Sequence, residues 1–261
     1  MALQEVRHVF TKIETHFPPD SKDLSSPIVL SLYHSALHVY LESEGCFDIT
    51  VASLSKTWGF FDKSYRLPSP SEIQAIVKTI GMDKIREEEN ALVLPPEISL
   101  DWGGIAKGLG IDLAVKALME MGVSSGLINA GGDLFCWGEN PDRQAWKVGI
   151  KHPRKNGFLG TLTGSNYGVA TSGDYQRYFE SKGIRYHHVF DPRTGYPARG
   201  KQSVTVIGPE TLLCDALSTA LFVSNNPEKI IDNFPGYGAV IQDSEGKIFM
   251  VGAPFSFQPA K

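Results

Sequence analysis

Several features that would mark a specialised class of protein are missing from this sequence. Its 261 residues include three cysteines, Cys46, Cys136 and Cys214, and no CxxC spacing. An odd number of cysteines without metal-ligand spacing argues against a disulfide framework and against a zinc site. The 25 Lys and Arg do not outnumber the 29 Asp and Glu, and no basic block occurs. Because phosphate neutralisation needs clustered cations, nucleic-acid binding is not expected.

Long apolar runs and the common nucleotide-loop signatures are also missing. No run approaches the roughly 18 apolar residues of a membrane-spanning helix, so no membrane span is expected. The Walker pattern GxxxxGK followed by Ser or Thr does not occur, and GLGIDLA falls inside a predicted helix rather than before one. With 42% apolar and 21% charged residues, the composition is that of an ordinary globular protein.

The most informative stretch that is present runs from Asp101 to Asp133. It reads as a strand end, a glycine turn, a helix, a buried strand and a second glycine turn. Gly103 and Gly104 permit positive φ and close approach of the backbone, and Gly122 is expected to stop the helix. One buried helix face is expected at Ile105, Leu109, Leu113, Leu118 and Met121. The two pairs of glycines, each beside a carboxylate, resemble a backbone cradle for phosphate. Glycine turns also join strands to helices in proteins that bind nothing, so both interpretations stay open.

The rest of the chain predicts a mixture of helices and strands. Apolar spacing predicts helices over 3–16, 28–42, 71–80, 211–223 and 227–234, with Ser71 capping the third. Alternating or β-branched segments predict strands over 84–89, 91–94, 146–151, 159–163, 167–171, 203–207, 239–242 and 248–251. Strands dominate after residue 140, and neither a repeat nor a linker is evident. We therefore expect one α+β domain over 1–261, with mixed or antiparallel sheets flanked by helices.

Asp215 and Thr219 lie four residues apart on a predicted helix and hence on one face. A carboxylate and a hydroxyl in this arrangement can hold a hard cation such as Mg²⁺. The alternative is that Asp215 favours the helix dipole and Thr219 is surface. Lys107, early in the central helix, opposes the dipole there, and a phosphate bound at that helix start would explain its position.

His187 and His188 precede an Asp-Pro turn. Neighbours in a strand face opposite sides, so only one of them can point into a site. A lone histidine in such a position is more often structural than catalytic. If His188 is the one that acts, we expect His187→Ala to be nearly silent.

Five segments together are similar to the signatures of the FAD:protein FMN transferases, the ApbE-like flavin transferases. They are DWGGIAKG, NAGGD, ATSGDYQRY, HHVFDPRTGYP and DALSTALFV, in order along the chain. The resemblance implies a T-fold-like α+β architecture. It also implies Mg²⁺-dependent cleavage of the FAD pyrophosphate, transfer of FMN through a phosphoester to a Thr or Ser of an acceptor protein, and release of AMP.

The resemblance also implies roles for individual residues. The metal ligands would be the Gly104 carbonyl, the Asp215 carboxylate and the Thr219 hydroxyl. His188 would assist phosphoryl transfer, with Asp215 as the other catalytic residue. FAD would contact Cys46, Phe47, Asp48, Asp101, Lys107 and Val189. Independently of the resemblance, an aromatic side chain nearby, Phe47 or Tyr175, is expected to stack on one of its rings.

Two departures from the family pattern bear on function and compartment. Family members usually begin with a strand that carries a Met-Gly-Thr segment and an FAD contact, and this segment has no counterpart here. Neither a signal peptide nor a lipobox cysteine is evident, so a cytoplasmic protein is expected; a trimmed chain would instead be periplasmic or membrane-anchored. An FAD hydrolase that forms FMN and AMP, and a flavin-binding protein without turnover, are the alternatives.

Overall fold

The computed structural model describes residues 24–253 and 255–260, so the helix expected over 3–16 lies outside the described residues. At its centre is a six-stranded antiparallel sheet in the order β14-β13-β12-β7-β4-β3. The strands are β3 (Gly126–Ala130), β4 (Asp133–Trp137), β7 (Tyr167–Gly173), β12 (Lys201–Gly208), β13 (Gly238–Asp243) and β14 (Ile248–Gly252).

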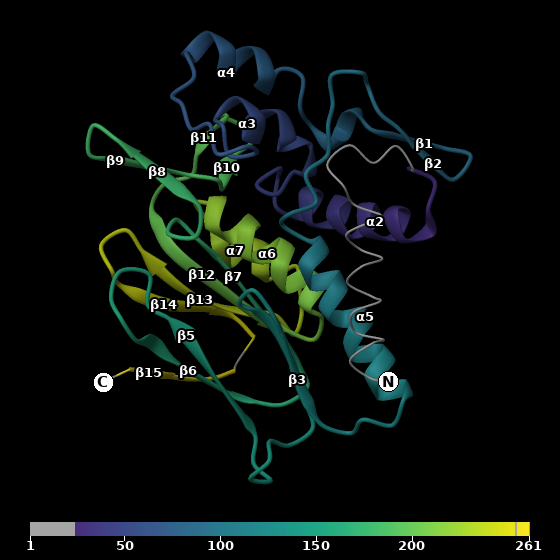
Figure 1. Cartoon of the computed structure of the whole chain (residues 1–261), viewed down its shortest axis with the longest axis vertical. Coiled ribbons are helices and arrows are strands. Elements are labelled where there is room, and N and C mark those ends of the chain that lie inside the picture. The colour runs from purple at the N-terminus through teal and green to yellow at the C-terminus, as the bar shows by residue number, and fades with distance from the viewer. Residues whose placement is uncertain (1–23, 254, 261) are drawn as a thin grey trace.

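Two helices, α5 (Ala106–Glu120) and α6 (Thr211–Val223), cover one face of this sheet (Figure 1). The other face packs on a three-stranded sheet, β15-β6-β5. Its strands are β5 (Trp146–Lys151), β6 (Phe158–Gly164) and β15 (Ser256–Pro259). Side chains alternate between the two faces, because successive residues of a strand point to opposite sides. Ala170 of β7 therefore joins the helix-side core, whereas Val169 joins the core between the sheets.

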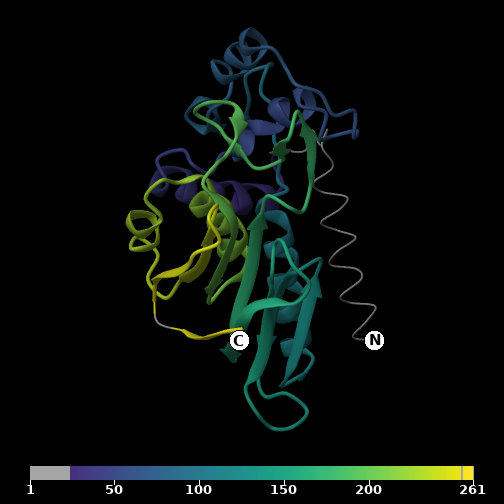
Figure 2. The ribbon, with the colours of Figure 1, turned by 90° about the vertical axis from the view of Figure 1, so that its left-hand side faces the viewer.

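The N-terminal segments and three short hairpins form a layer above the sheets (Figures 1 and 2), and its first described helix packs on α6 in the helix-side core. The helical segments are α2 (Pro27–Glu42), η1 (Ile49–Val51), α3 (Ala52–Thr57), α4 (Pro70–Val77) and η2 (Met82–Lys84). The strands are β1 (Arg86–Glu88), β2 (Ala91–Val93), β8 (Tyr178–Ser181), β9 (Ile184–His187), β10 (Phe190–Asp191) and β11 (Tyr196–Pro197). Buried Trp58 and Phe60 hold this layer to the hairpins, and Trp58 Nε1 donates to the Gly195 carbonyl at 3.0 Å. The helix α7 (Pro227–Ile231) follows α6.

Most predicted elements are confirmed, including α6 and β5 with the bounds expected from the sequence. The hairpin of β1 and β2 turns at Glu89 and Asn90, whose φ angles are 50° and 62°. Ser71 is not the cap of α4. The cap is Ser69, two residues earlier. Its hydroxyl accepts a hydrogen bond from the Glu72 amide, and the Glu72 carboxylate accepts one from the Ser69 amide, which makes a capping box with Pro70 in the first turn.

The expected apolar face of α5 is confirmed only in part: Ile105 is buried and Leu109 and Leu118 pack against core clusters, but the most buried positions within the helix are others. Gly108, Gly110, Ile111, Ala114 and Val115 are buried, whereas Met121 is exposed. The reason is close packing on α6: a Cβ on Gly108 would lie 2.4 Å from the Thr211 carbonyl oxygen, so only glycine fits. Small residues thus decide which face of the helix is covered.

The glycine turns also differ from expectation. Positive φ occurs at Gly131 (68°) and Gly132 (111°), but not at Gly103 or Gly104. No strand ends before the first turn, and β3 is a half-exposed edge strand rather than a buried one. Gly122 does end α5 with φ 86°. No helix in the described part of the chain is both long and apolar enough to cross a membrane.

Candidate functional site

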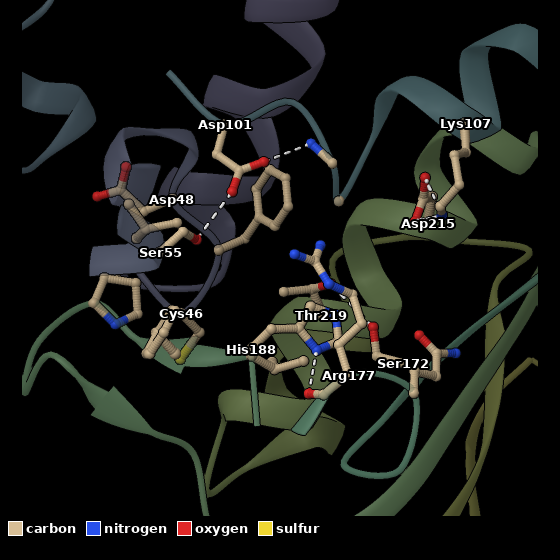
Figure 3. Close-up of a pocket in the computed structure, with 18 of the residues that line it drawn as sticks. Cys46, Asp48, Ser55, Asp101, Lys107, Ser172, Arg177, His188, Asp215 and Thr219 are labelled. Carbon is tan, nitrogen blue, oxygen red and sulfur yellow. Dashed lines mark hydrogen bonds and ion pairs between the residues drawn. The ribbon is translucent and has the colours of Figure 1, made fainter. Parts of the chain in front are cut away.

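A pocket of about 220 Å³ lies where α5, α6 and β7 meet the N-terminal layer (Figure 3). The candidate site residues named from the sequence, Tyr175 excepted, line it: Cys46, Phe47, Asp48, Asp101, Gly104, Lys107, His188, Val189, Asp215 and Thr219. These residues come from distant parts of the chain. The fold therefore brings together side chains that the sequence keeps far apart.

Lys107 and two carboxylates form the charged part of the pocket. The Lys107 ammonium pairs with Asp133 and lies 3.2 Å and 3.3 Å from the two Asp215 oxygens. The Gly108 amide, at the start of α5, donates to Asp215 at 3.2 Å. Burial alone would lower the pKa of Lys107, but Asp215 and Asp133 outweigh burial and hold it above its ordinary value. The ammonium therefore stays charged, and the ion pair explains a cation placed early in the helix.

Asp215 is 4% exposed, and its carboxylate is costly to ionise there. Burial raises the pKa of Asp215 to about 6, with Lys107 lowering it and Asp133 raising it. A carboxylate held in this way gains from an added cation more than an exposed carboxylate does, because little water competes for its charge.

Oxygen atoms gather one helical turn beyond Asp215. Thr219 Oγ1 is 3.0 Å from Ser172 Oγ, which lies 2.8 Å from Ser218 Oγ. Gly104 lies against the same hydroxyl, since a Cβ on Gly104 would be 3.5 Å from Thr219 Oγ1 and 3.2 Å from the Phe47 ring. Glycine is therefore suited to this position because the turn approaches α6 and Phe47 closely.

The two adjacent histidines differ in their burial and in the hydrogen bonds of their rings. His187 is 3% exposed and both ring nitrogens are used, Nε2 with the Ala198 carbonyl at 2.8 Å and Nδ1 with the Val189 amide at 3.3 Å. His188 faces the pocket, and its Nδ1 lies 3.2 Å from the Arg177 carbonyl (Figure 3). A carbonyl can only accept, so Nδ1 carries the proton and Nε2 of neutral His188 is left as an acceptor. Burial, then the charge of Arg177, lowers the pKa of His188 to about 3.

The loop side of the pocket is held by hydrogen bonds to carboxylates. Asp101 accepts from the Gly103 amide at 2.9 Å and from Ser55 Oγ at 3.2 Å. Asp48 accepts from both the amide and the hydroxyl of Thr50, at 2.7 Å and 2.6 Å, and so caps η1. Burial raises the pKa of Asp48, whereas the bonds from Thr50 lower it. Its carboxylate is largely engaged in fixing the loop.

Cys46 and Phe47 lie beside this loop side and are both 3% exposed. Burial raises the pKa of the Cys46 thiol, so it stays protonated and behaves as a small apolar residue. Phe47 presents a ring edge toward Gly104. Tyr175, the alternative for stacking, is not in this pocket; it covers Gly173 and lines a second cavity.

Some pocket residues were missed by sequence reasoning, chiefly Ser55, Ser172, Gln176 and Arg177. The last three fall in or next to the segment ATSGDYQRY, which was singled out without roles for them. Ser55 carries no local signal, because only tertiary packing brings it to Asp101. The second glycine pair was placed in the same phosphate cradle as the first, but Gly131 and Gly132 line the second cavity.

Among the described residues, no group of three or more His, Cys, Asp or Glu side chains is arranged to hold a metal. The expected ligand set is of another kind, with one carboxylate, one hydroxyl and one carbonyl. These features define an α+β protein whose pocket combines oxygen donors, a held ammonium and a neutral imidazole, a combination suited to a phosphorylated ligand.

The model of the ApbE family matches residues 14–240. The FAD:protein FMN transferase of Haemophilus influenzae is 32% identical over 199 residues, which are 72% of this chain and 58% of that protein. The Treponema pallidum protein of the same name is 32% identical over 243 residues, or 83% of this chain and 67% of its own. This chain therefore spans about six tenths of the length of the first of these relatives.

Solved structures agree with the sequence comparison. The ApbE protein of Thermotoga maritima superposes with a TM-score of 0.84 at 32% identity, covering 96% of this chain and 87% of that one. The apo flavinyl transferase ApbE of Pseudomonas stutzeri gives 0.80 at 28% identity, covering 98% and 85%. The chain belongs to the ApbE family, and the expected α+β ApbE architecture is confirmed.

Proposed function

We propose that this chain is an FAD:protein FMN transferase, which cleaves the pyrophosphate of FAD and attaches FMN to a Thr or Ser hydroxyl of an acceptor protein. The carrying observation is that Lys107, Asp215, Thr219 and His188 line one pocket. The names of the relatives point to the same activity. Cleaving a pyrophosphate needs positioning and charge neutralisation more than covalent chemistry, and these groups can supply both.

Mg²⁺ is part of the proposal, and the residues present fit it. The buried Asp215 carboxylate, the Thr219 hydroxyl one turn later and the adjacent Gly104 turn offer only oxygen donors, which Mg²⁺ prefers. The ion would neutralise charge that develops on the pyrophosphate oxygens. Gly104, Asp215 and Thr219 would hold it.

The remaining groups act on the substrate. The Lys107 ammonium and the amides at the start of α5 favour a pyrophosphate beside the glycine turn. The acceptor oxygen then bonds to the FMN phosphorus while the phosphorus–oxygen bond to AMP breaks. The hydroxyl proton passes to Nε2 of His188, and AMP leaves. Although the pKa of His188 is low, the negative charge of a bound pyrophosphate favours the imidazolium and raises it.

The loop side of the pocket is assigned to the rest of FAD. Cys46, Phe47 and Val189 offer buried apolar surface beside a ring system, and Asp48 and Asp101 offer fixed carboxylates. Phe47 is the aromatic candidate for a ring contact.

The test is incubation with FAD and Mg²⁺, with and without a purified flavin-acceptor protein. Transfer predicts AMP release that the acceptor accelerates above the slow release to water, and flavin fluorescence on the acceptor band of a denaturing gel. AMP release at the same rate without acceptor would show a hydrolase instead. A chelator is the control for the metal. FAD should also raise the melting temperature, as any ligand of the native state does. Failure of FAD both to stabilise the protein and to be cleaved would refute the proposal.

A further inference from the structure

A second cavity, of about 500 Å³, lies between the six-stranded and the three-stranded sheets. One side is formed by residues 148–151 of β5, and the opposite side by the turn of residues 131–133 between β3 and β4. Thr171 and Gln176 line this cavity and the first pocket alike. The two cavities therefore share a wall.

The shared wall is thin because one strand of the sheet ends early there and leaves a notch beside its neighbour. β4 begins at Asp133, whereas its neighbour β7 continues to Gly173 and pairs onward only with β12. Lys107 bridges the notch, since it pairs with Asp133, which lines the second cavity, and with Asp215, which lines the first. Gln176 lines both cavities beside this bridge and donates to the Thr171 carbonyl at 2.9 Å. A hydroxyl in the second cavity is thus separated by single side chains from the charged end of the pocket.

The cavity is also bordered by a free strand edge. Within residues 24–253 and 255–260, β5 is the outer strand of its sheet and pairs with β6 alone. The Ala260 amide donates to the Leu159 carbonyl, so the odd-numbered residues of β6 bond toward β15 and the even-numbered ones toward β5. The register of β5 with β6 then leaves the backbone groups of Lys147 and Gly149 pointing outward. No hydrogen bond within the described residues uses them.

The charge along this edge is positive. Lys147 and Lys151 are exposed and take part in no ion pair among the residues that the structure describes. An unpaired edge of this kind recruits an extended segment through main-chain hydrogen bonds. Free lysines beside it favour carboxylates on that segment.

We propose that the acceptor protein docks here: an extended, carboxylate-bearing segment pairs with the outer edge of β5 and presents its Thr or Ser through the notch. This assignment rests on the proposed function and deepens it. FAD occupies the first pocket, and the acceptor approaches the pyrophosphate from the opposite face of the sheet. Water can replace the acceptor hydroxyl without using the groove, so docking and FAD cleavage are separable.

The test compares proline variants of the full chain. Lys147→Pro removes an outward amide and keeps the bonds to β6, a substitution that edge strands tolerate. With the acceptor protein that the wild-type chain labels, we expect kcat/KM for transfer to fall at least about tenfold, the effect of losing one main-chain bond together with the approach of the segment. AMP release from FAD without acceptor should stay unchanged. Lys147→Ala, which keeps the amide, should transfer FMN within about twofold of the wild type.

Two further measurements keep the proposal falsifiable. Met250→Pro places the same substitution on the exposed outer strand β14, away from the groove, and should leave transfer unchanged. Hydrogen exchange with and without acceptor should show new protection in residues 146–151. Normal transfer by Lys147→Pro, or protection confined to the exposed aromatic surface around Phe61 and Tyr65, would overturn the assignment.

Equal loss of transfer and of acceptor-free cleavage would overturn the assignment as well. A wild-type chain that cleaves FAD but labels no acceptor would refute the transferase function itself, and the groove with it.

Discussion

The two sides of the pocket are built differently. On one side, Lys107, Ser172, Asp215 and Thr219 stand on α5, β7 and α6, the helices and the strand that pack together in the sheet-and-helix part of the fold. On the other, Cys46, Asp48, Asp101 and His188 stand on loops of the N-terminal layer and its hairpins. The helix-and-strand side carries the opposed charges, whereas the loop side carries carboxylates already bonded to their own backbone.

This difference separates chemistry from recognition. Groups on helices and strands keep their positions more closely than groups on loops, and phosphoryl transfer depends on position. Substrate binding tolerates less exact positions of the contacting groups, since its free energy is the sum of several contacts. His188 is the exception that joins the two sides: it belongs to a loop, but the Arg177 carbonyl fixes its ring. The comparison predicts that changes on the helix-and-strand side reduce turnover and that changes on the loop side reduce affinity.

The largest expected effect is that of Asp215→Ala. Removing the buried carboxylate removes a proposed metal ligand and leaves Lys107 to Asp133 alone. Metal-dependent AMP release should fall by roughly 10²–10³-fold or more, the scale of losing one transition-state electrostatic group. The melting temperature should change little, because Lys107 keeps Asp133 as its partner and the cost of burying the Asp215 charge offsets what its pairing returns.

A matched control is available on α5. Asp112 accepts the Thr211 and Leu212 amides at 2.9 Å and 2.8 Å, and so caps α6 without lining the pocket. Asp112→Ala should lower stability and spare turnover, the reverse of Asp215→Ala. Full activity of Asp215→Ala at ordinary Mg²⁺ concentration would end the metal proposal.

The next effect in size is that of His188→Ala. Loss of a general base costs roughly 10²–10⁴-fold, so we expect a rate at least about 10²-fold lower with FAD affinity nearly unchanged. Steady-state kinetics and an FAD titration separate the two quantities. A weaker affinity for FAD with a normal rate would show that His188 serves binding rather than the chemical step.

His187→Ala is the comparison for His188→Ala, although we expect it to change the stability of the protein. The His187 ring bonds Ala198 and Val189 and packs edge-on against Phe222, so His187→Ala removes two buried hydrogen bonds and leaves a void. The expectation that His187→Ala is nearly silent therefore extends only to the chemical step. We expect a loss of stability of about 2–4 kcal/mol, measured by denaturant unfolding.

A smaller effect is the pH dependence of stability that His187 causes. Burial lowers the pKa of His187 to about 4, against about 6.5 in an unfolded chain. Between these values the unfolded state binds more protons, so the free energy of unfolding decreases as pH falls from 6.5 toward 4 and is fully retained above 6.5. The loss should reach at most about 3 kcal/mol. In His187→Gln, whose amide can still donate to Ala198 and does not titrate, the profile should become less steep, while the contribution of His188, whose pKa is also lowered, remains. An unchanged slope would show that His187 does not contribute.

Much of the fold could be predicted because its signals are local. The apolar run of Thr211–Val223 and the alternation in β5 depend on neighbouring residues alone. The buried face of α5 could not be predicted in the same way. Its choice depends on Gly108 meeting the backbone of Thr211, about a hundred residues away, and larger leucines at helical spacing gave a stronger pattern that was only partly correct.

The residues of the site likewise fall into those that local sequence predicts and those that only tertiary packing brings together. Asp215 and Thr219 are predictable as neighbours because one helix turn joins them. The ion pair of Lys107 with both Asp133 and Asp215 was not predicted, since nothing local links the three positions. Cys46, Phe47 and Asp48 were named only through family resemblance, because their pocket position arises from tertiary packing of a loop.

The smallest expected effect is that of Ser55→Ala on the loop side. Ser55 donates to Asp101 at 3.2 Å, and Asp101 keeps its bond from the Gly103 amide when the hydroxyl is lost. One hydrogen bond of this kind contributes about 0.5–1.5 kcal/mol, so the Kd for FAD should rise roughly two- to tenfold with kcat unchanged. Fluorescence titration and steady-state rates measure both quantities on the same protein. A fall in kcat at unchanged Kd would show that this loop positions the reacting phosphates. The division between a chemical side and a recognition side would then be wrong, even for a residue whose replacement is expected to have the smallest effect.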